Sequence, residues 1–282
     1  MDPAHRDRLL IVHCDDVGLS WEANEAARRL LTQGVATSCS VMVPCPWSYE
    51  FLMWYREHPK LDVGIHLTLT SEWATYRWPP LTAGRGLRDK DGFMHRRPEE
   101  VIKHASVEEV YEESKAQVQR ALEWGVQLTH LDTHMGASLA SYGFAQAYLR
   151  LAESFGLPPM LLKPTPELQS QAIEQGYDLR IFELMEQAST PRLTGLFSAA
   201  RKGTYRATKE AVYRQLAQLP TGVSYFIIHP ALASDTMRAI TGSWQQRYFE
   251  YLIFMEEETR RFIEAQGIQL VSWRKLQAST ET

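Results

Sequence analysis

The segment LLIVHCDDVG, residues 9–18, joins a nearly continuous apolar run to two adjacent carboxylates and then to a glycine. A short apolar run of this kind predicts a strand buried on both faces, as the strands of parallel sheets are. In folds built on parallel sheets, the active site lies at the carboxyl ends of the strands. Asp15 and Asp16 therefore stand where we expect an active site.

Two further strand-like segments end in metal-ligating side chains. VGIHLTL, residues 63–69, carries His66, and LTHLDTH, residues 128–134, carries His130, Asp132 and His134. One aspartate and two histidines from separate strand ends are a common ligand set for a divalent metal. The pattern therefore predicts a metal-dependent enzyme.

Strand-like runs alternate with helical ones along the chain, which favours a parallel sheet with right-handed crossovers. Strands are predicted at residues 9–14, 38–43, 61–69, 130–134, 160–163, 224–229 and 268–272. Helices are predicted at residues 20–33, 49–56, 107–124, 141–155, 209–218 and 244–265. We expect an α/β chain that forms a (β/α) barrel as one domain over residues 1–282, with an open doubly wound sheet as the competing topology.

One long segment interrupts this alternation. Residues 71–106 lack a sustained period and greatly exceed the usual length of a strand–helix connection. The segment carries Trp73, Tyr76 and Trp78, which suggests a functional lid whose aromatic rings stack on a substrate. Packing of the same rings onto the barrel is the alternative. Residues 190–208, with a basic cluster, are predicted to form a solvated loop.

The composition excludes several classes of function. The 282 residues are 44% hydrophobic and 23% charged, with a formal net charge of −4, so neither nucleic acid nor an anionic membrane is expected as a partner. No nucleotide-binding glycine motif is present, and no apolar run reaches the roughly 18 residues of a membrane span. Three cysteines without zinc-site spacing, and a beginning unlike a signal peptide, suggest the cytoplasm.

The spacing of the charged residues suggests how roles are divided. Neighbours on an extended strand point to opposite sides, so Asp15 and Asp16 are expected to differ in role. His130, Asp132 and His134 alternate and are expected to share one face of their strand. Each histidine taken alone could instead be an ordinary hydrogen-bonded polar residue. His229 follows another apolar run, and its usual pKa suits a general acid.

Four motifs together resemble those of the YdjC-like (ChbG-like) carbohydrate deacetylases, and the resemblance extends over most of the chain. They are HCDDVGLS at residues 13–20, GIHLTLT at 64–70, HLDTH at 130–134 and His229-Pro230. Arg247 and Glu250 stand where the family carries an arginine and a glutamate on its last long helix. The resemblance implies a distorted, TIM-barrel-like (β/α) fold related to polysaccharide deacetylases.

The resemblance also implies the roles of particular residues. Asp16, His66 and His134 would bind the metal, with Asp15 as general base and His229 as general acid. The chain departs from the family at Val17, where phenylalanine is usual, at residues 135–137, where further histidines are usual, and at Lys163, where arginine is usual. These departures concern the substrate side of the pocket rather than the metal ligands.

From these roles we expect one divalent ion, zinc first, with Mg, Mn, Co or Ni as alternatives. The ion and its ligands would hydrolyse the amide of an N-acetylated sugar or oligosaccharide. Asp132 would orient a ligand histidine, with His130 beside it. Trp73, Tyr76, Trp78, Lys163 and Arg247 would contact the sugar. Another metal-dependent amidohydrolase, a phosphoesterase and a non-catalytic sugar-binding barrel are the competing functions, and a homo-oligomer is compatible with the sequence.

Overall fold

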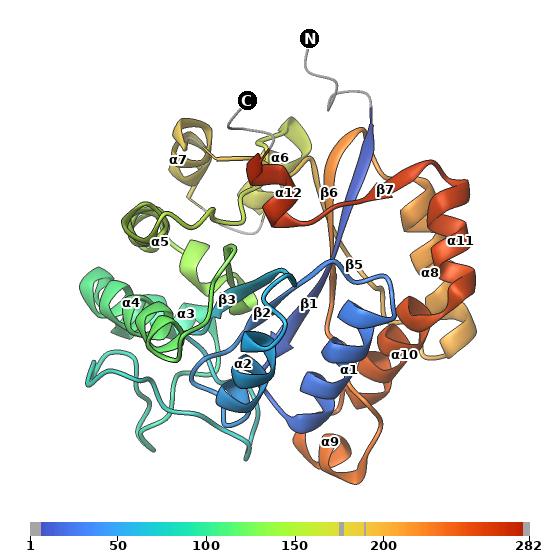
Figure 1. The fold of residues 1–282 in the computed structure, drawn as a ribbon. Coiled ribbons are helices and arrows are strands. Elements are labelled where there is room, and N and C mark those ends of the chain that lie inside the picture. The colour runs from blue at the N-terminus through green and yellow to red at the C-terminus, as the bar shows by residue number, and fades with distance from the viewer. Residues whose placement is uncertain (1–6, 175–177, 189, 279–282) are drawn as a thin grey trace.

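A seven-stranded parallel sheet forms the centre of the molecule (Figure 1). The computed structural model describes residues 7–174, 178–188 and 190–278. The strands are β1 (Arg8–Val17), β2 (Ser38–Val41), β3 (Val63–Leu67), β4 (Leu131–Thr133), β5 (Gly195–Ser198), β6 (Gly222–Ile228) and β7 (Ile268–Leu270). Their order is β4-β3-β2-β1-β6-β5, and β7 pairs with the first residues of β1. The predicted α/β fold is confirmed, with the sheet curled into a half-barrel.

Helices cover the outside of the curled sheet (Figure 1). They are α1 (Trp21–Thr32), α2 (Ser48–Arg56), α3 (Pro98–His104), α4 (Val107–Glu123), η2 (His134–Leu139), α5 (Tyr142–Phe155), α6 (Pro166–Glu174), α7 (Arg180–Gln187), α8 (Tyr205–Ala217), α9 (Asp235–Ile240), α10 (Trp244–Met255), α11 (Glu257–Ala265) and α12 (Trp273–Ala278). Serine or threonine side chains cap many of these helices, as Ser20 does for α1. None of the helices in the described ranges has the length and apolar character needed to cross a membrane.

The predicted strand at residues 160–163 is present only as an extended link. Leu131 of β4 bridges to Pro159, and Leu162 bridges to Leu193 just before β5. These single bridges connect the two ends of the sheet without forming a full strand. Because Pro158 and Pro159 have no backbone N–H to donate, a continuous hydrogen-bonded ladder cannot form at the start of this segment.

Two other predictions about elements were wrong. The helix expected over residues 244–265 is two helices, α10 and α11, because Glu256 between them has an extended backbone with ψ 135°. The Glu256 carboxylate accepts a hydrogen bond from Lys209, a long-range contact that holds it at this break. Residues 190–208, expected to be a solvated loop, contain β5 and the start of α8, which Thr204 caps.

The insertion over residues 71–106 is irregular until α3 and lies beside α4 (Figure 1). Glu113 of α4 is fully buried and accepts hydrogen bonds from the backbone N–H groups of Leu81 and Thr82, at 3.0 and 2.8 Å. Glu109 accepts another from the Gly86 N–H at 2.9 Å. The insertion is thus tied to the barrel through two carboxylates of α4, the buried Glu113 and the partly exposed Glu109.

Candidate active site

Three metal-ligating side chains meet at the carboxyl ends of three strands. Asp16 belongs to β1, His66 to β3, and His134 directly follows β4. Asp16 Oδ1 lies 3.5 Å from His66 Nε2 and 3.2 Å from His134 Nδ1, and all three residues are buried. When several ligand atoms each lie about 2.0–2.2 Å from one ion, the separations between those atoms are close to the two separations just given. The three side chains can therefore hold one divalent cation.

A local irregularity of β1 brings both aspartates to this centre. The register with β2 shifts between Cys14 and Val17, and Asp16 has a left-handed backbone with φ 61°. Such a bulge redirects side chains that regular alternation would send to opposite faces. Asp15 Oδ2 consequently lies 3.9 Å from His66 Nε2, on the same side as Asp16. The prediction that the two carboxylates point to opposite sides was wrong for this reason.

Each of these histidines is oriented by a carboxylate at its other ring nitrogen. His66 Nδ1 lies 2.7 Å from Asp132 Oδ1, and His134 Nε2 lies 3.1 Å from Glu72 Oε2. Since an ionised carboxylate only accepts hydrogen bonds, these nitrogens carry the proton when each ring is neutral, and His66 Nε2 and His134 Nδ1 are then the free nitrogens that face the centre. Glu72, at the start of the insertion, was missed by the sequence analysis because no spacing relates it to His134.

The donor set fits a cation. Asp16 Oδ1 is buried without a hydrogen-bond partner, although two ring nitrogens lie nearby. Burial opposes protonation of His134, but Glu72 and Asp16 outweigh it and raise the pKa of His134 to about 9. At neutral pH without metal, the ring of His134 therefore carries a second proton, and metal binding would displace that proton.

Arg247 from α10 contacts Asp16 and also lines the cavity described below, so its predicted contact with the substrate stays a prediction. Its Nη2 lies 2.6 Å from Asp16 Oδ2, and its guanidinium is 5.7 Å from the Trp73 ring centre. Burial alone would raise the pKa of Asp16, but Arg247 and the neighbouring His134 hold it well below its usual value. Asp16 is therefore ionised, with one oxygen held by Arg247 and the other facing the histidines. The other terminal nitrogen of Arg247, Nη1, is buried without a partner.

Asp15 and His229 lie next to each other at the edge of the centre. Asp15 Oδ2 is 3.8 Å from His229 Nε2. Burial raises the pKa of Asp15 to about 7, with His66 opposing the shift. Removal from bulk water lowers the pKa of His229 to about 4, with Asp16 opposing and Arg247 adding to the shift, although 38% of its side chain is exposed. The His229 backbone N–H donates to Glu250 at 2.6 Å, which holds the end of β6 against α10.

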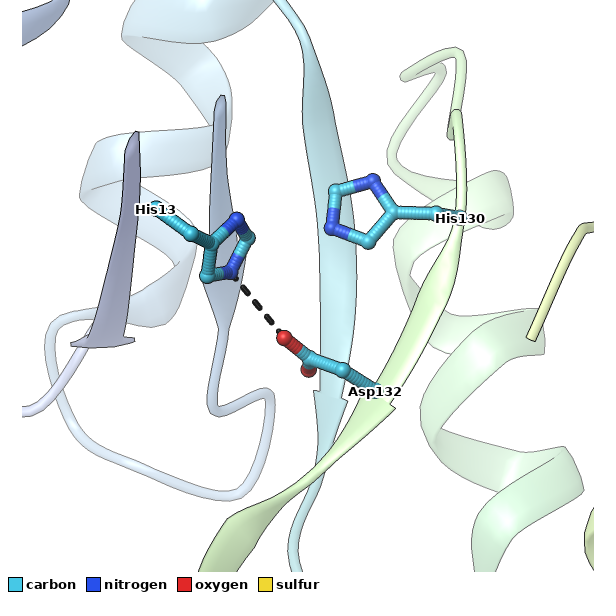
Figure 2. Close-up of side chains that lie close together, drawn as sticks. All are labelled: His13, His130 and Asp132. Atoms are coloured by element: carbon cyan, nitrogen blue, oxygen red, sulfur yellow. Dashed lines mark ion pairs between the residues drawn. The ribbon is translucent and has the colours of Figure 1, made fainter. Parts of the chain in front are cut away.

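His130 does not share the centre with His134. The strand β4 ends at Thr133, and Met135 and Gly136 have left-handed backbones, so the chain turns away from the regular alternation. The His130 ring instead stacks on Trp273, with ring centres 5.1 Å apart. Figure 2 shows His130 facing His13, and Asp132, two residues further along the same segment, pointing to the same side and in contact with His13. Asp132 lies beside both His13 and His66, and His134 lies beside His66, so His130, Asp132 and His134 occupy successive levels along the chain and only His134 reaches the group of Asp16 and His66.

The aromatic residues of the insertion pack together, and Trp78 is enclosed. Trp78 is 1% exposed, contacts the Met42 and Met94 cluster, and donates from Nε1 to the Thr70 carbonyl. Trp73 and Tyr76 are only half-buried. The contacts of Trp78 therefore match packing, the alternative to a role in substrate binding, whereas Trp73 is partly exposed and lies near Arg247.

A cavity of about 250 Å³ opens beside His229 and Arg247. Its other lining residues come from β5, the segment that follows it, and α10; they are Ser198, Ala199, Arg201, Ser243, Gln246 and Glu250. Arg201 belongs to the basic cluster that was expected to be solvated. Lys163 is exposed and, within the part of the chain that the structure describes, is not among the residues that line this cavity.

Comparisons with known proteins are consistent with this arrangement. A sequence model described as "YdjC-like protein" matches residues 9–265. A Thermus thermophilus protein named carbohydrate deacetylase is 35% identical over 257 residues, covering 91% of this chain and 89% of that protein. A second carbohydrate deacetylase, from Thermoanaerobacter pseudethanolicus, is 25% identical and covers 94% of this chain and 98% of its own.

The fold is shared with solved structures. A protein from Enterococcus faecalis named for cellobiose-phosphate cleavage superimposes with a TM-score of 0.79 at 24% identity, covering 96% of this chain and 99% of that one. A protein from Agrobacterium tumefaciens superimposes with a TM-score of 0.54 at 12% identity, covering 96% and 89%. At these identities the likeness concerns the fold alone.

Proposed function

Because the chain belongs to the YdjC-like family, we propose that it is a metal-dependent hydrolase that removes acetyl groups from N-acetylated sugars. The observation that carries the proposal is the convergence of Asp16, His66 and His134 with Asp15 and His229 beside them. A protein that only bound sugar would have no use for a base, an acid and a ligand set in one place.

The ligand set supports one divalent ion, with zinc as the first candidate. His66 Nε2, His134 Nδ1 and Asp16 Oδ1 would hold it. When bound, such an ion supplies Lewis acidity to the amide carbonyl and to the attacking water. Mg, Mn, Co and Ni also accept ligand sets that include a carboxylate, so the identity of the ion is a matter for measurement.

The remaining steps belong to side chains of the protein. Asp15 takes a proton from the attacking water through Oδ2, the oxygen that faces His66 and His229. The pKa of Asp15, raised by burial to about 7, makes this carboxylate a stronger base than an exposed one. His229 then protonates the leaving nitrogen. A neutral His229 can receive that proton from Asp15, 3.8 Å away, so one proton serves both steps.

The sugar would occupy the cavity beside His229. Gln246 and Ser243 supply hydrogen-bonding groups there, and Arg201 supplies a cation. Trp73, whose ring centre lies 5.7 Å from the guanidinium of Arg247, would stack on the apolar face of a sugar ring. Arg247 contributes indirectly, because its guanidinium holds Asp16.

Acetate release from N-acetylglucosamine oligomers, measured with metal-free protein to which each metal is added back, tests the proposal. We expect release only after metal addition. Asp15→Asn should keep one equivalent of metal and lose about 10²–10⁴-fold in kcat, the usual cost of losing a general base. Loss of the metal in Asp15→Asn would mean that Asp15 is a ligand.

The competing functions predict other outcomes of the same assay. Phosphate release from phosphate esters, with no acetate release, would favour a phosphoesterase. Hydrolysis of simple amides but not of N-acetylated sugars would favour another amidohydrolase. Sugar binding without turnover at any metal would favour a non-catalytic protein.

A further inference from the structure

The two oxygens of Asp15 have different surroundings. Oδ2 faces His66 and His229, where the reaction would occur. Oδ1 is buried without a regular hydrogen bond, and the ring nitrogen nearest to it among the described contacts is His13 Nε2, at 3.3 Å. His13 itself is fully buried on β1. His13 therefore contacts the Asp15 oxygen that does not face the reaction centre, and His13 has no part in the steps above.

His13 also contacts the carboxylate that orients His66. Its Nε2 lies 3.0 Å from Asp132 Oδ2, the contact drawn in Figure 2. The other oxygen of Asp132 is held by His66 Nδ1 at 2.7 Å. His13 thus joins Asp15 to Asp132, and through Asp132 to His66, although these residues come from three different strands.

We propose that His13 is a positioning residue that holds Asp15 and Asp132 in register, so that the Oδ2 atom of Asp15 faces the reaction centre. The inference rests on the proposed function, in which Asp15 is the base. It requires that His13 donate a hydrogen from Nε2, because the two carboxylates near this atom only accept and its third neighbour, Ser40 Oγ, gives its own hydrogen to Asp132.

The surroundings of His13 favour the tautomer that carries its hydrogen on Nε2. Its Nδ1 lies 2.6 Å from Ser38 Oγ, a hydroxyl that can donate to it. With Nδ1 accepting, the proton of a neutral ring is on Nε2, between the two carboxylates. The ring is also clamped by stacking on Tyr225, with centres 4.8 Å apart. Position, tautomer and orientation are thus each determined by a separate neighbour.

The same residues have one other reading. His13, His130 and Asp132 could together hold a second metal ion, since their ligating atoms lie within 4.8 Å of one another. His130 Nε2 is buried without a partner, which favours that reading. Against it, Ser40 Oγ already lies 3.0 Å from His13 Nε2 and 2.8 Å from Asp132 Oδ2, so a hydroxyl lies against both of these atoms. The hydrogen-bonded network accounts for more of the contacts.

Two substitutions at the buried position of His13 separate the role of the ring's shape from the role of its Nε2 hydrogen-bond donor. His13→Phe keeps an aromatic ring on Tyr225 but removes both nitrogens, whereas His13→Gln can place an amide N–H near the position of Nε2. We expect His13→Phe to lower kcat about 10–100-fold, the range found for outer residues of metal sites, with KM and one equivalent of metal unchanged. His13→Gln should recover most of kcat.

Tyr148→Phe is the matched control. It also removes a buried polar group, since the Tyr148 hydroxyl donates to the Leu131 carbonyl at 2.7 Å, but it touches none of the proposed catalytic residues. It should lose stability without a change in kcat. An unchanged kcat in His13→Phe, or a kcat in His13→Gln as low as in His13→Phe, would overturn the inference. Loss of a second equivalent of metal in His13→Phe would also overturn it, in favour of a metal at His13, His130 and Asp132.

A crystal structure of His13→Phe tests the inference without any assay of activity. The Asp15 carboxylate should rotate or occupy two positions, and unmoved Asp15 and Asp132 carboxylates would overturn the inference. Failure of the proposed function is recognised separately, because wild-type protein would then release no acetate with any metal. In that case the crystal structure alone decides whether His13 positions Asp15.

Discussion

At the scale of single residues, the two histidines of the candidate metal site depend on carboxylates from different parts of the chain. Asp132 comes from the strand next to His66, whereas Glu72 comes from the insertion. A carboxylate behind a ligand histidine selects the tautomer and makes the other nitrogen a better ligand. Glu72 therefore couples the insertion to the metal site.

Glu72→Gln should weaken metal binding. The amide cannot supply the negative charge that strengthens His134 as a ligand, so we expect divalent-metal affinity to fall about 10–100-fold. Competition titration against a chelator measures the affinity. Glu99→Gln, at an exposed site in the same insertion, is the control and should bind as wild-type does. Equal affinity in Glu72→Gln and wild-type would show that Glu72 has no part in metal binding.

His229→Ala should affect amide and activated-ester substrates differently. An amine must be protonated to leave, whereas a phenolate with a low pKa leaves without a proton. We therefore expect a loss in kcat of about 10²–10⁴-fold on an N-acetylated sugar and a much smaller loss on an activated acetyl ester. Parallel steady-state kinetics on both substrates test this, and equal losses would assign His229 to substrate positioning.

At the scale of elements, long-range contacts of charged side chains decide where helices begin. Asp62, just before β3, is buried and accepts hydrogen bonds from the backbone N–H groups of Trp273 and Arg274 at the start of α12. Burial raises the pKa of Asp62 above its usual value. The carboxylate therefore both caps a helix and carries a cost when it is ionised.

Asp62→Asn should become more stable relative to wild-type as the pH rises. The folded protein has the higher pKa at Asp62, so it binds more protons than the unfolded chain as the pH rises above about 3.9, and wild-type stability falls there. The amide keeps the acceptor without the charge. Denaturant unfolding at pH 3 and pH 7 should show an advantage of Asp62→Asn only at pH 7.

Asp62→Ala serves as the comparison, because it removes the acceptor as well. It should lose about 1 kcal/mol relative to wild-type at pH 3, the typical cost of a missing helix cap, and less at pH 7, where the wild-type protein carries the cost of the ionised Asp62. A less stable Asp62→Asn protein at pH 7 would show that the charge at the start of α12 stabilises more than its burial costs.

Trp78→Ala should destabilise the protein rather than act on substrate binding. The ring is 1% exposed and is enclosed by Leu19, Met42 and Met94. Truncation of a buried aromatic residue costs about 3–5 kcal/mol, which a fall in the unfolding midpoint would record. Trp73→Ala is the matched substitution: it should cost less stability and raise KM, if Trp73 stacks on the sugar. A raised KM with unchanged stability in Trp78→Ala would show that Trp78 contributes to substrate binding after all.

At the scale of the whole molecule, the proposed metal ligands come from strands that are distant in the sequence. Asp16 belongs to β1, and His66 and His134 lie at the ends of β3 and β4, with β2 between β1 and β3 in the sheet. An ion bound by all three joins these strands only in the folded protein. Metal binding should therefore stabilise the fold as a whole.

Addition of metal at a hundred times its Kd should raise the free energy of unfolding by about 2.7 kcal/mol. Removal of the metal with a chelator should reverse the change. His66→Ala and His134→Ala should fold but show no such increase, because each lacks one ligand. Thermal unfolding with and without metal measures the effect, and an equal increase in either variant would place the ion elsewhere.

The sequence by itself determined the fold class and named the residues that the structure brings together at the strand ends. Strands alternating with helices specify a parallel sheet, and such a sheet places its carboxyl strand ends at one edge, so Asp15, His66 and Asp132 could be recognised from position alone. These inferences succeed because periodicity and strand ends are local features of a chain. His229 was found in the same way.

Only the tertiary structure decided which partner each of these residues meets. Arg247 reaches Asp16 across 231 positions of the chain, and Glu72 reaches His134 across 62, and neither separation has a local signature. The shared direction of Asp15 and Asp16 depends on a bulge against β2, which interrupts the alternation from which the sequence argument began. Packing between distant elements, rather than local propensity, therefore determines how the site is assembled.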